Sequence, residues 1–320
     1  MHMKYELAIR VSLIIAAVLL TCLQAVSQTP QSPVPPIDKP RMVILNVRVV
    51  DADGHAGSDV GQDAFRVVED GIPQKIDLFS KAEIPITYGL VIDCSGSLRS
   101  QIGKVVQAGM KIVQSNKPED EAFLIRFISS DKIETVQDIT SDKRRLLAGL
   151  DELYIEGGRT AVIDAVYLAA ERLVKRRVED NSLRRYALVL VSDGEDRSSY
   201  YKKEQLLSLL GSADIQIYVI GFKGEMKEKA KQPAEELLKT FATNTGGRAF
   251  FPNSSDDLTG IADEIVNDLR VQYVIGYVPS DQKAAEGFHK LQVSITDEGN
   301  QQKRIAITRL GYSVPKKAKE

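Results

Sequence analysis

Acidic and hydroxyl-bearing side chains gather in three short segments of this 320-residue chain. Two of the segments directly follow apolar runs, residues 88–92 and 186–191, and the third is a Gly-Gly-Arg-Thr loop that ends at residue 160. Carboxylate and hydroxyl oxygens are the ligands that hard divalent cations prefer. We therefore predict a site for Mg²⁺, or for Mn²⁺ or Ca²⁺, formed by five residues: Asp93, Ser95, Ser97, Thr160 and Asp193.

The charge of this set favours a ligand from outside the chain. Asp93 and Asp193 bring two negative charges, which balance a dication, while hydroxyls and water complete its shell. A carboxylate from another molecule could then replace a water, whereas a site with four carboxylates would repel it. Gly96 lets the backbone turn between Ser95 and Ser97.

The elements that must position these residues alternate between strand and helix over residues 84–270. This alternation predicts a doubly wound α/β fold with a mostly parallel sheet, in which ligands bind beyond the carboxyl ends of the strands. Residues 122–127 and 133–136 are expected to form a hairpin at an antiparallel edge. Helices are predicted at 98–115, 142–153, 160–175, 202–210, 233–243 and 256–269, and further strands at 215–220 and 249–251.

The flanks of this segment are β-rich. Strands are expected at 42–50, 65–69 and 75–79, and again at 271–277, 290–295 and 303–307. Neither flank has enough apolar residues for its own core. We therefore predict that residues 41–83 and 271–314 pair in one small β-sandwich beside an α/β domain at 84–270.

The N-terminus has the pattern of an export signal. Lys4 and Arg10 precede an apolar run at 11–26 that is shorter than a membrane span, and Ala25-Val26-Ser27 resembles a cleavage site. A signal peptide at 1–27 and a Pro-rich linker at 28–40 place the mature chain in the periplasm, on the cell surface or outside the cell, with no transmembrane span. An uncleaved anchor and a lipoprotein modified at Cys22 are the alternatives. Residues 315–320 form a basic tail.

Composition excludes other classes of partner and site. The formal net charge is −2, so no global field attracts nucleic acid. The only other cysteine, Cys94, ends an apolar run and is expected to be an unreactive buried thiol. Three histidines, His2, His55 and His289, are scattered along the chain, and no His-based metal or catalytic site is expected.

The five oxygen-bearing residues resemble the metal-ion-dependent adhesion site of von Willebrand factor type A (VWA) domains. That pattern is D-x-S-x-S, then a Thr, then an Asp. Further segments resemble an exported bacterial "VWFA-related" family described from Acidobacteria, over about residues 43–312. They are Glu69-Asp70-Gly71, Ile84-Pro85, Thr245-Gly246-Gly247 and Gln272-Tyr273-Val274-Ile275-Gly276-Tyr277.

This resemblance implies a Rossmann-like fold and a role in binding. Ser95, Ser97 and Thr160 would contact the ion through hydroxyls, Asp93 and Asp193 directly or through water, and a protein partner's Asp or Glu would complete the shell. Leu98, Arg159 and Glu195 are expected at the partner-binding rim, while Asp164 and Asp196 are expected to be outer-shell or solvated acids.

Several alternatives remain at this point. Ser97 and Thr160 could be helix N-caps, because Ser and Thr are common there. The metal could only stabilise the loops of an envelope scaffold. A Mg²⁺-dependent hydrolase is a weaker alternative, because Ser95 stands where dehalogenase-type phosphatases need a second Asp. No G-x-S-x-G elbow and no P-loop is present, so we predict that the chain is not an enzyme.

Overall fold

The computed structural model describes residues 42–52, 54–55, 57, 59–180, 182–222, 228–280, 286–296 and 303–314. The predicted signal peptide, the linker at 28–40 and the basic tail at 315–320 lie outside these residues. No helix in the described part is long and apolar enough to cross a membrane.

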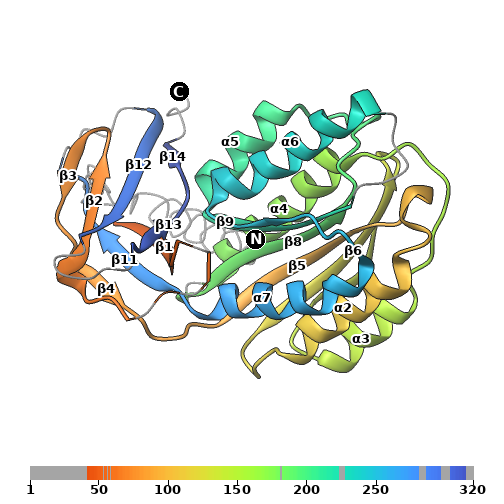
Figure 1. Ribbon diagram of the computed structural model, residues 1–320, viewed down its shortest axis with the longest axis horizontal. Helices are drawn as coiled ribbons and strands as arrows, with labels where there is room; N and C mark the ends of the chain where they lie inside the picture. The colour runs from red at the N-terminus through yellow and green to blue at the C-terminus, as the bar shows by residue number, and fades with distance from the viewer. Residues whose placement is uncertain are drawn as a thin grey trace, which may run out of the picture. The chain divides into compact units, whose positions relative to one another are not determined.

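A six-stranded sheet forms the centre of the α/β part (Figure 1), in the order β10-β9-β8-β5-β6-β7. All neighbours pair in parallel except β7, which runs antiparallel to β6 at the edge, as the hairpin pattern predicts. The strands are β5 (Ile86–Asp93), β6 (Glu121–Ser129), β7 (Lys132–Thr140), β8 (Arg185–Ser192), β9 (Ile215–Gly221) and β10 (Ala249–Phe250).

Helices cover both faces of this sheet, so its middle strands are buried along their whole length. One face packs on α2 (Ile102–Gln114), α3 (Lys143–Asp151) and α7 (Leu258–Arg270). The other packs on α4 (Val162–Glu179), α5 (Lys203–Ala213) and α6 (Glu228–Thr245). Figure 1 shows the two layers. The fold is therefore the predicted doubly wound α/β arrangement.

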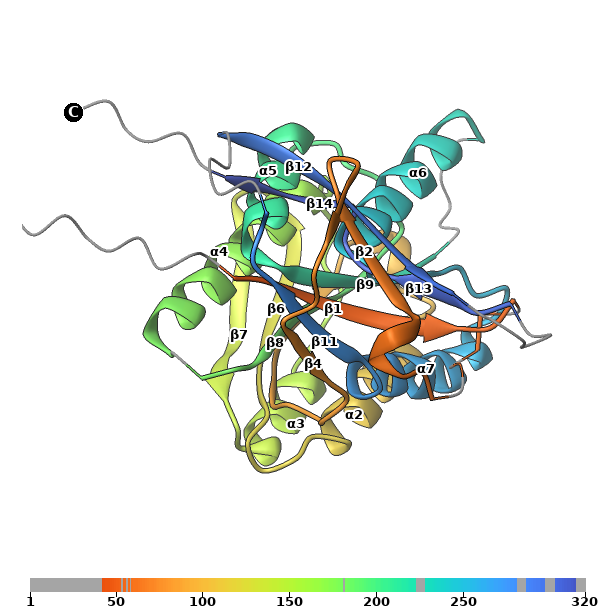
Figure 2. The same cartoon turned by 90° about the vertical axis from the view of Figure 1, so that its left-hand side faces the viewer.

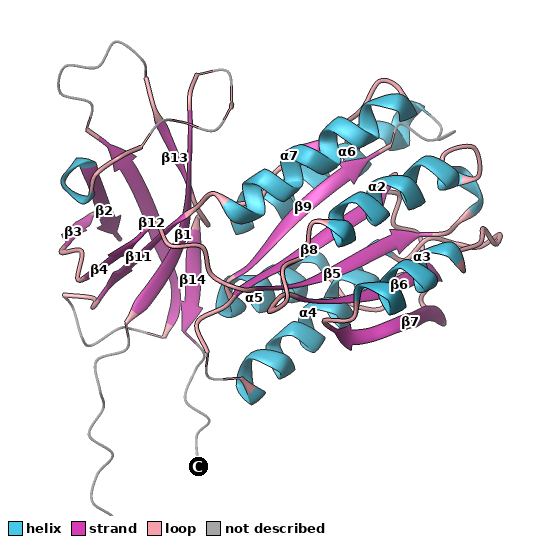
Figure 3. Cartoon of the chain, turned by 90° about the horizontal axis from the view of Figure 1, so that it is seen from below, coloured by secondary structure: helices cyan, strands magenta, loops and turns pink. Residues whose placement is uncertain are grey.

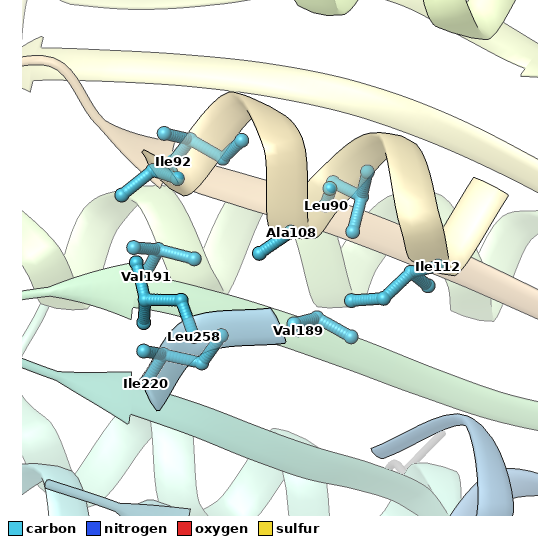
Figure 4. Close-up of a pocket in the computed structure, with 10 residues that line it drawn as sticks. Leu90, Ile92, Ala108, Ile112, Val189, Val191, Ile220 and Leu258 are labelled. Atoms are coloured by element: carbon cyan, nitrogen blue, oxygen red, sulfur yellow. The ribbon is translucent and has the colours of Figure 1, made fainter. Parts of the chain in front are cut away.

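The core between the sheet and helices α2 and α7 contains one small cavity of about 10 Å³ (Figure 4). This volume is near the lower limit for a single water molecule, and the lining side chains are apolar. We interpret it as a packing gap. Its lining includes Leu90, Ile92, Ala108, Ile112, Val189, Val191, Ile220 and Leu258.

The flanking strands form two four-stranded sheets, in the orders β13-β1-β11-β4 and β14-β12-β2-β3. Apolar residues of both sheets, including Leu45, Tyr277, Phe65 and Leu291, share one buried cluster, so the sheets form the predicted sandwich (Figure 3). The strands are β1 (Val43–Val50), β2 (Phe65–Glu69), β3 (Ile72–Gln74), β4 (Leu78–Ser80), β11 (Tyr273–Tyr277), β12 (Gly287–Ile295), β13 (Ile305–Ile307) and β14 (Gly311–Val314).

Each sheet of the sandwich combines strands from both ends of the chain. β1 lies between β11 and β13 (Figure 2). β2 lies between β12 and β3. All of these pairs are antiparallel. Neither flank could form either sheet without the other.

Three local expectations need correction. α6 begins at Glu228, so Pro233 lies inside the helix instead of starting it. The strand expected at 75–79 is replaced by two short strands, β3 and β4, on either side of residue 76. β14 was not expected, because it is short and only partly buried, without an alternating pattern.

Candidate functional site

Asp93 is the last residue of β5, and its side chain is completely buried. One carboxylate oxygen accepts a hydrogen bond from the backbone N–H of Ser95 at 2.9 Å, and the other accepts from the hydroxyl of Ser192 at 2.8 Å. Burial, followed by the nearby charge of Asp193, raises the pKa of Asp93 to about 7. A cation beside the two acids would offset both effects.

Ser95 and Ser97 point their hydroxyls at each other, with 3.0 Å between the two Oγ atoms. Ser95 is buried and Ser97 is partly buried. Helix α2 begins only at Ile102, with Gln101 at its N-cap position, so Ser97 does not cap it. Ser95 precedes a short 3₁₀ turn at Gly96–Leu98, but its side chain makes no capping hydrogen bond there. The N-cap explanation therefore fails for this loop.

Thr160 lies in the loop before α4 and is 6% exposed. The N-cap residue of α4 is Ala161, and no side chain caps that helix. The carbonyl of Thr160 accepts from the N–H of Arg197 at 2.8 Å, and the carbonyl of Cys94 accepts from the N–H of Glu156 at 2.9 Å. Backbone hydrogen bonds thus join all three predicted loops at one edge of the sheet.

Asp193 directly follows β8 and is 3% exposed. One of its carboxylate oxygens accepts from the N–H of Glu195 at 3.0 Å. The next residue, Gly194, has φ +80°, and a Cβ there would lie 2.7 Å from the carbonyl oxygen of Ala234 in α6. Glycine is needed at this position because any side chain would be strained and would push α6 away from the loop.

Ser192 is a site residue that the sequence reasoning missed. Its hydroxyl donates to Asp93 and accepts from the N–H of Gly194 at 3.0 Å, so one buried side chain links the first loop to the third. The sequence feature that could have indicated Ser192 is a hydroxyl residue at the end of a predicted strand, immediately before an acidic residue. Apolar periodicity gives no information about such a polar bridge.

The three residues predicted at the rim differ in how exposed they are. Arg159 is exposed, and Glu195 is partly buried in an ion pair with Arg197 at 2.6 Å. Leu98 was expected at the rim, but it is only 1% exposed and belongs to the apolar cluster under α2. This corrects the expectation: its side chain fills the core instead of facing a partner.

The other two acids near the site hold the surrounding backbone. Asp164 is buried and accepts from the N–H groups of Tyr200 and Tyr201, each at 2.8 Å. Asp196 accepts from the N–H of Ile163 at 3.3 Å, in the first turn of α4. Both carboxylates are thus used in shaping the third loop around Thr160.

The residues that the structure brings together fit a divalent cation. Two buried carboxylates carry the charge that balances a dication, and the hydroxyls of Ser95, Ser97 and Thr160 stand in the connected loops. The side chains that donate hydrogen bonds to Asp93 are those of Ser95 and Ser192, which are neutral. A buried acid pair of this kind favours a positive ion.

Residues 89–264, more than half of the chain, match the family model of the von Willebrand factor type A domain. The chain therefore belongs to the VWA family. A search of curated proteins finds no match to it.

Three solved structures are among those that are similar to this chain. A von Willebrand factor type A protein from Catenulispora acidiphila is 10% identical, with a TM-score of 0.49 over 84% of this chain and 73% of that one. The protein BatB from Bacteroides thetaiotaomicron is 17% identical, and the match has a TM-score of 0.45 and covers 57% of this chain and 98% of BatB. Mussel proximal thread matrix protein 1 with a zinc-occupied MIDAS motif is 13% identical. That match has a TM-score of 0.49 and covers 59% of this chain and 48% of the mussel protein.

Proposed function

We propose that this VWA protein binds a divalent cation through Asp93, Ser95, Ser97, Thr160 and Asp193, and engages a protein partner through an Asp or Glu of that partner. Mg²⁺ is the expected ion, with Mn²⁺ or Ca²⁺ as alternatives. The single observation that carries this proposal is the close pair of serine hydroxyls beside the buried Asp93. When bound, the ion supplies a Lewis-acidic position for the partner's carboxylate.

The surroundings of the site support an acidic partner group. Arg159 is exposed beside Thr160, and Arg197 is about half exposed. The rim acid Glu195 is already paired with Arg197, so it offers little repulsion to an incoming carboxylate. Positive groups at a rim raise association rates with acidic ligands more than they raise affinity.

Binding, not catalysis, is the role that these residues support. A serine nucleophile needs a neighbouring base. The two described histidines lie elsewhere: His55 lies against Asp51, and His289 against Asp70, both in the sandwich flanks. We therefore propose that the chain acts without enzymatic turnover.

The backbone bonds between the loops also favour binding over a purely structural metal. The Cys94–Glu156 and Thr160–Arg197 hydrogen bonds join the loops through the protein itself. An ion is thus not the sole link between them, and it is left to act on a ligand. A scaffold role would instead predict strong thermal stabilisation by Mg²⁺ with no carboxylate ligand.

We propose that this binding takes place outside the cytoplasm. The support is the charged and apolar pattern of residues 1–27, followed by a proline-rich segment. Periplasm, cell surface and extracellular space fit this pattern equally.

Capture from the native envelope tests the proposal. Immobilised protein should retain a partner in Mg²⁺ and release it in EDTA, and Asp93→Ala should retain none. Glu119→Ala is a matched control, because Glu119 is an exposed acid just before β6, at the opposite edge of the parallel sheet. Capture that persists in EDTA and in Asp93→Ala would refute the metal bridge.

A further inference from the structure

We propose that Glu69, Asp70 and His289 form a second metal site, in the β-sandwich, which takes a borderline transition-metal dication such as Zn²⁺. The three residues offer ligand atoms that all lie within 4.8 Å of one another. His289 is far from the acids in sequence, which is why its position gave no indication of a site.

Strand pairing brings the three residues together. Glu69 ends β2 and lies opposite Leu291 of β12, while Asp70 begins the turn into β3. The backbone N–H of Asp70 donates to the carbonyl of Lys290 at 2.9 Å, and the N–H of Lys290 donates to the Asp70 carboxylate at 2.8 Å. This double connection fixes Asp70 beside His289, the preceding residue of β12.

The two distances from His289 to the acids are those of a metal shell. Nδ1 of His289 lies 2.8 Å from a carboxylate oxygen of Asp70 and 3.5 Å from one of Glu69. An ion that bonds N and O atoms at about 2.0–2.2 Å places neighbouring ligands roughly 2.8–3.6 Å apart, with the shorter values in an octahedral shell and the longer ones in a tetrahedral shell. A cation can therefore replace the proton that His289 now shares with Asp70, with only small side-chain shifts.

A second layer of contacts holds the ligands in place. The hydroxyl of Tyr277 donates to one oxygen of Glu69 at 2.6 Å, and the hydroxyl of Tyr312 donates to the other at 2.8 Å. The rings of His289 and Tyr312 stack with centroids 5.1 Å apart. Outer-shell partners of this type orient metal ligands and raise affinity.

Charge and access also fit a metal ion. Two carboxylates and one imidazole match the charge of a dication. Glu69 is buried, with a side chain 7% exposed, whereas Asp70 is 46% exposed and leaves a path from solvent.

The nitrogen ligand separates this site from the one at Asp93. Imidazole suits Zn²⁺, Co²⁺ and related ions, while a site made only of oxygens suits Mg²⁺, Mn²⁺ or Ca²⁺. The two sites should therefore differ in metal preference, and removing one should leave the other.

The test measures Zn²⁺ and Co²⁺ binding by calorimetry and by the visible absorption of bound Co²⁺, in the Asp93→Ala background and with Mg²⁺ in excess. This background should still bind one Zn²⁺, and Co²⁺ should show absorption that requires His289. Adding His289→Gln should abolish both signals. Adding His55→Gln should leave them unchanged, because His55 is an exposed histidine beside Asp51.

Two further variants distinguish the loss of a metal ligand from misfolding. Asp70→Asn keeps a residue that tolerates the positive φ of 49° but removes a charged ligand, so it should lose Zn²⁺ while keeping the melting temperature of the background. Tyr312→Phe should weaken Zn²⁺ binding about 10–100-fold. The proposal is overturned if the Asp93→Ala protein binds no Zn²⁺, or if folded Asp70→Asn or His289→Gln binds it as well as the background does.

Discussion

At the scale of single residues, the buried carboxylate of Asp93 determines how the VWA site responds to a cation. We expect Asp93→Asn to abolish stabilisation by Mg²⁺, because it removes half of the charge that balances the ion. At a hundredfold excess of Mg²⁺ over its dissociation constant, the wild-type protein should gain about 2.7 kcal/mol in free energy of unfolding. Thermal denaturation with and without Mg²⁺ measures this gain.

In the absence of metal, the same variant should be as stable as the wild-type protein or more stable. Asn keeps the shape of the side chain but removes the repulsion between Asp93 and Asp193, both of which are buried. Its NH₂ group can face the hydroxyl of Ser192, which can turn to accept a hydrogen bond, unlike the backbone N–H groups around Asp120. An equal Mg²⁺ response in the two proteins would show that Asp93 is not part of the metal site.

The five residues could be proposed as ligands from sequence because each lies in a short loop next to a strongly patterned strand or helix. The structure places all five at one edge of the sheet. Ser192 was missed because its role depends on a hydrogen bond to Asp93 across the sheet. Leu98 was misplaced because the 3₁₀ turn at Gly96–Leu98 rotates it toward the core, which local spacing does not reveal.

At the scale of elements, Asp120, in the turn before β6, links β5 to α7 at the amino-terminal edge of the central sheet. Its carboxylate is 1% exposed and accepts from the N–H of Ile86 at 3.0 Å, from the N–H of Lys117 at 2.6 Å, and from Arg270 at the end of α7. In Asp120→Asn, an NH₂ group replaces one carboxylate oxygen, so a hydrogen-bond donor faces donors from Ile86, Lys117 or Arg270. We expect it to lower the free energy of unfolding by about 3 kcal/mol.

Chemical denaturation measures this loss. Asp263→Asn is the matched control, since Asp263 is an exposed acid of α7 paired with Lys111, and it should cost under about 1 kcal/mol. Equal losses in the two variants would contradict the role given to Asp120.

Asp120 also predicts a dependence on pH. Burial alone would raise its pKa, but the bonds from Arg270, Lys117 and Ile86 hold the pKa below its ordinary value. As pH falls below about 4, the unfolded chain takes up this proton before the folded protein does, so stability decreases. This loss should begin near pH 4, continue down through the folded pKa, and be reduced in Asp120→Asn. Urea midpoints measured between pH 3 and 6 test it.

Elements with strong apolar patterns were predicted from sequence, and weakly patterned ones were not. β5 and β8 are continuous apolar runs because both of their faces are covered. The first third of α6, up to Pro233, is mostly polar, so the sequence predicted a start later than Glu228. For β14, pairing with β12 compensates for weak local preference, and that pairing is a long-range property.

At the scale of the whole molecule, a buried ion pair joins the sandwich to the α/β part. Arg48 of β1 contacts Asp268 of α7 at 2.7 Å, and the two side chains are only 4% and 7% exposed. Arg48→Ala should lower the free energy of unfolding by about 3–5 kcal/mol, because it leaves a buried charge with only a distant second partner, Arg248, at 3.9 Å. Guanidinium denaturation gives the value.

The double variant Arg48→Met/Asp268→Leu separates the effect of the charge from that of the contact. Replacing both ions with apolar side chains of similar size should recover most of the lost stability, since the cost lies in the uncompensated ion. If the double variant were as unstable as Arg48→Ala, packing and not charge would explain the loss.

The interleaved sheets of the sandwich also set an order in time. β1 is synthesised early, but its neighbours β11 and β13 are synthesised only after the whole α/β segment. β2 is also synthesised long before its neighbour β12. Until then, both strands present unpaired edges, which are prone to aggregate. Synthesis and any passage across a membrane must therefore keep the amino-terminal strands apart from other chains. If synthesis stops before residue 273, the released chain contains β1 and β2 but lacks β11, β12 and β13, the later strands that pair with them.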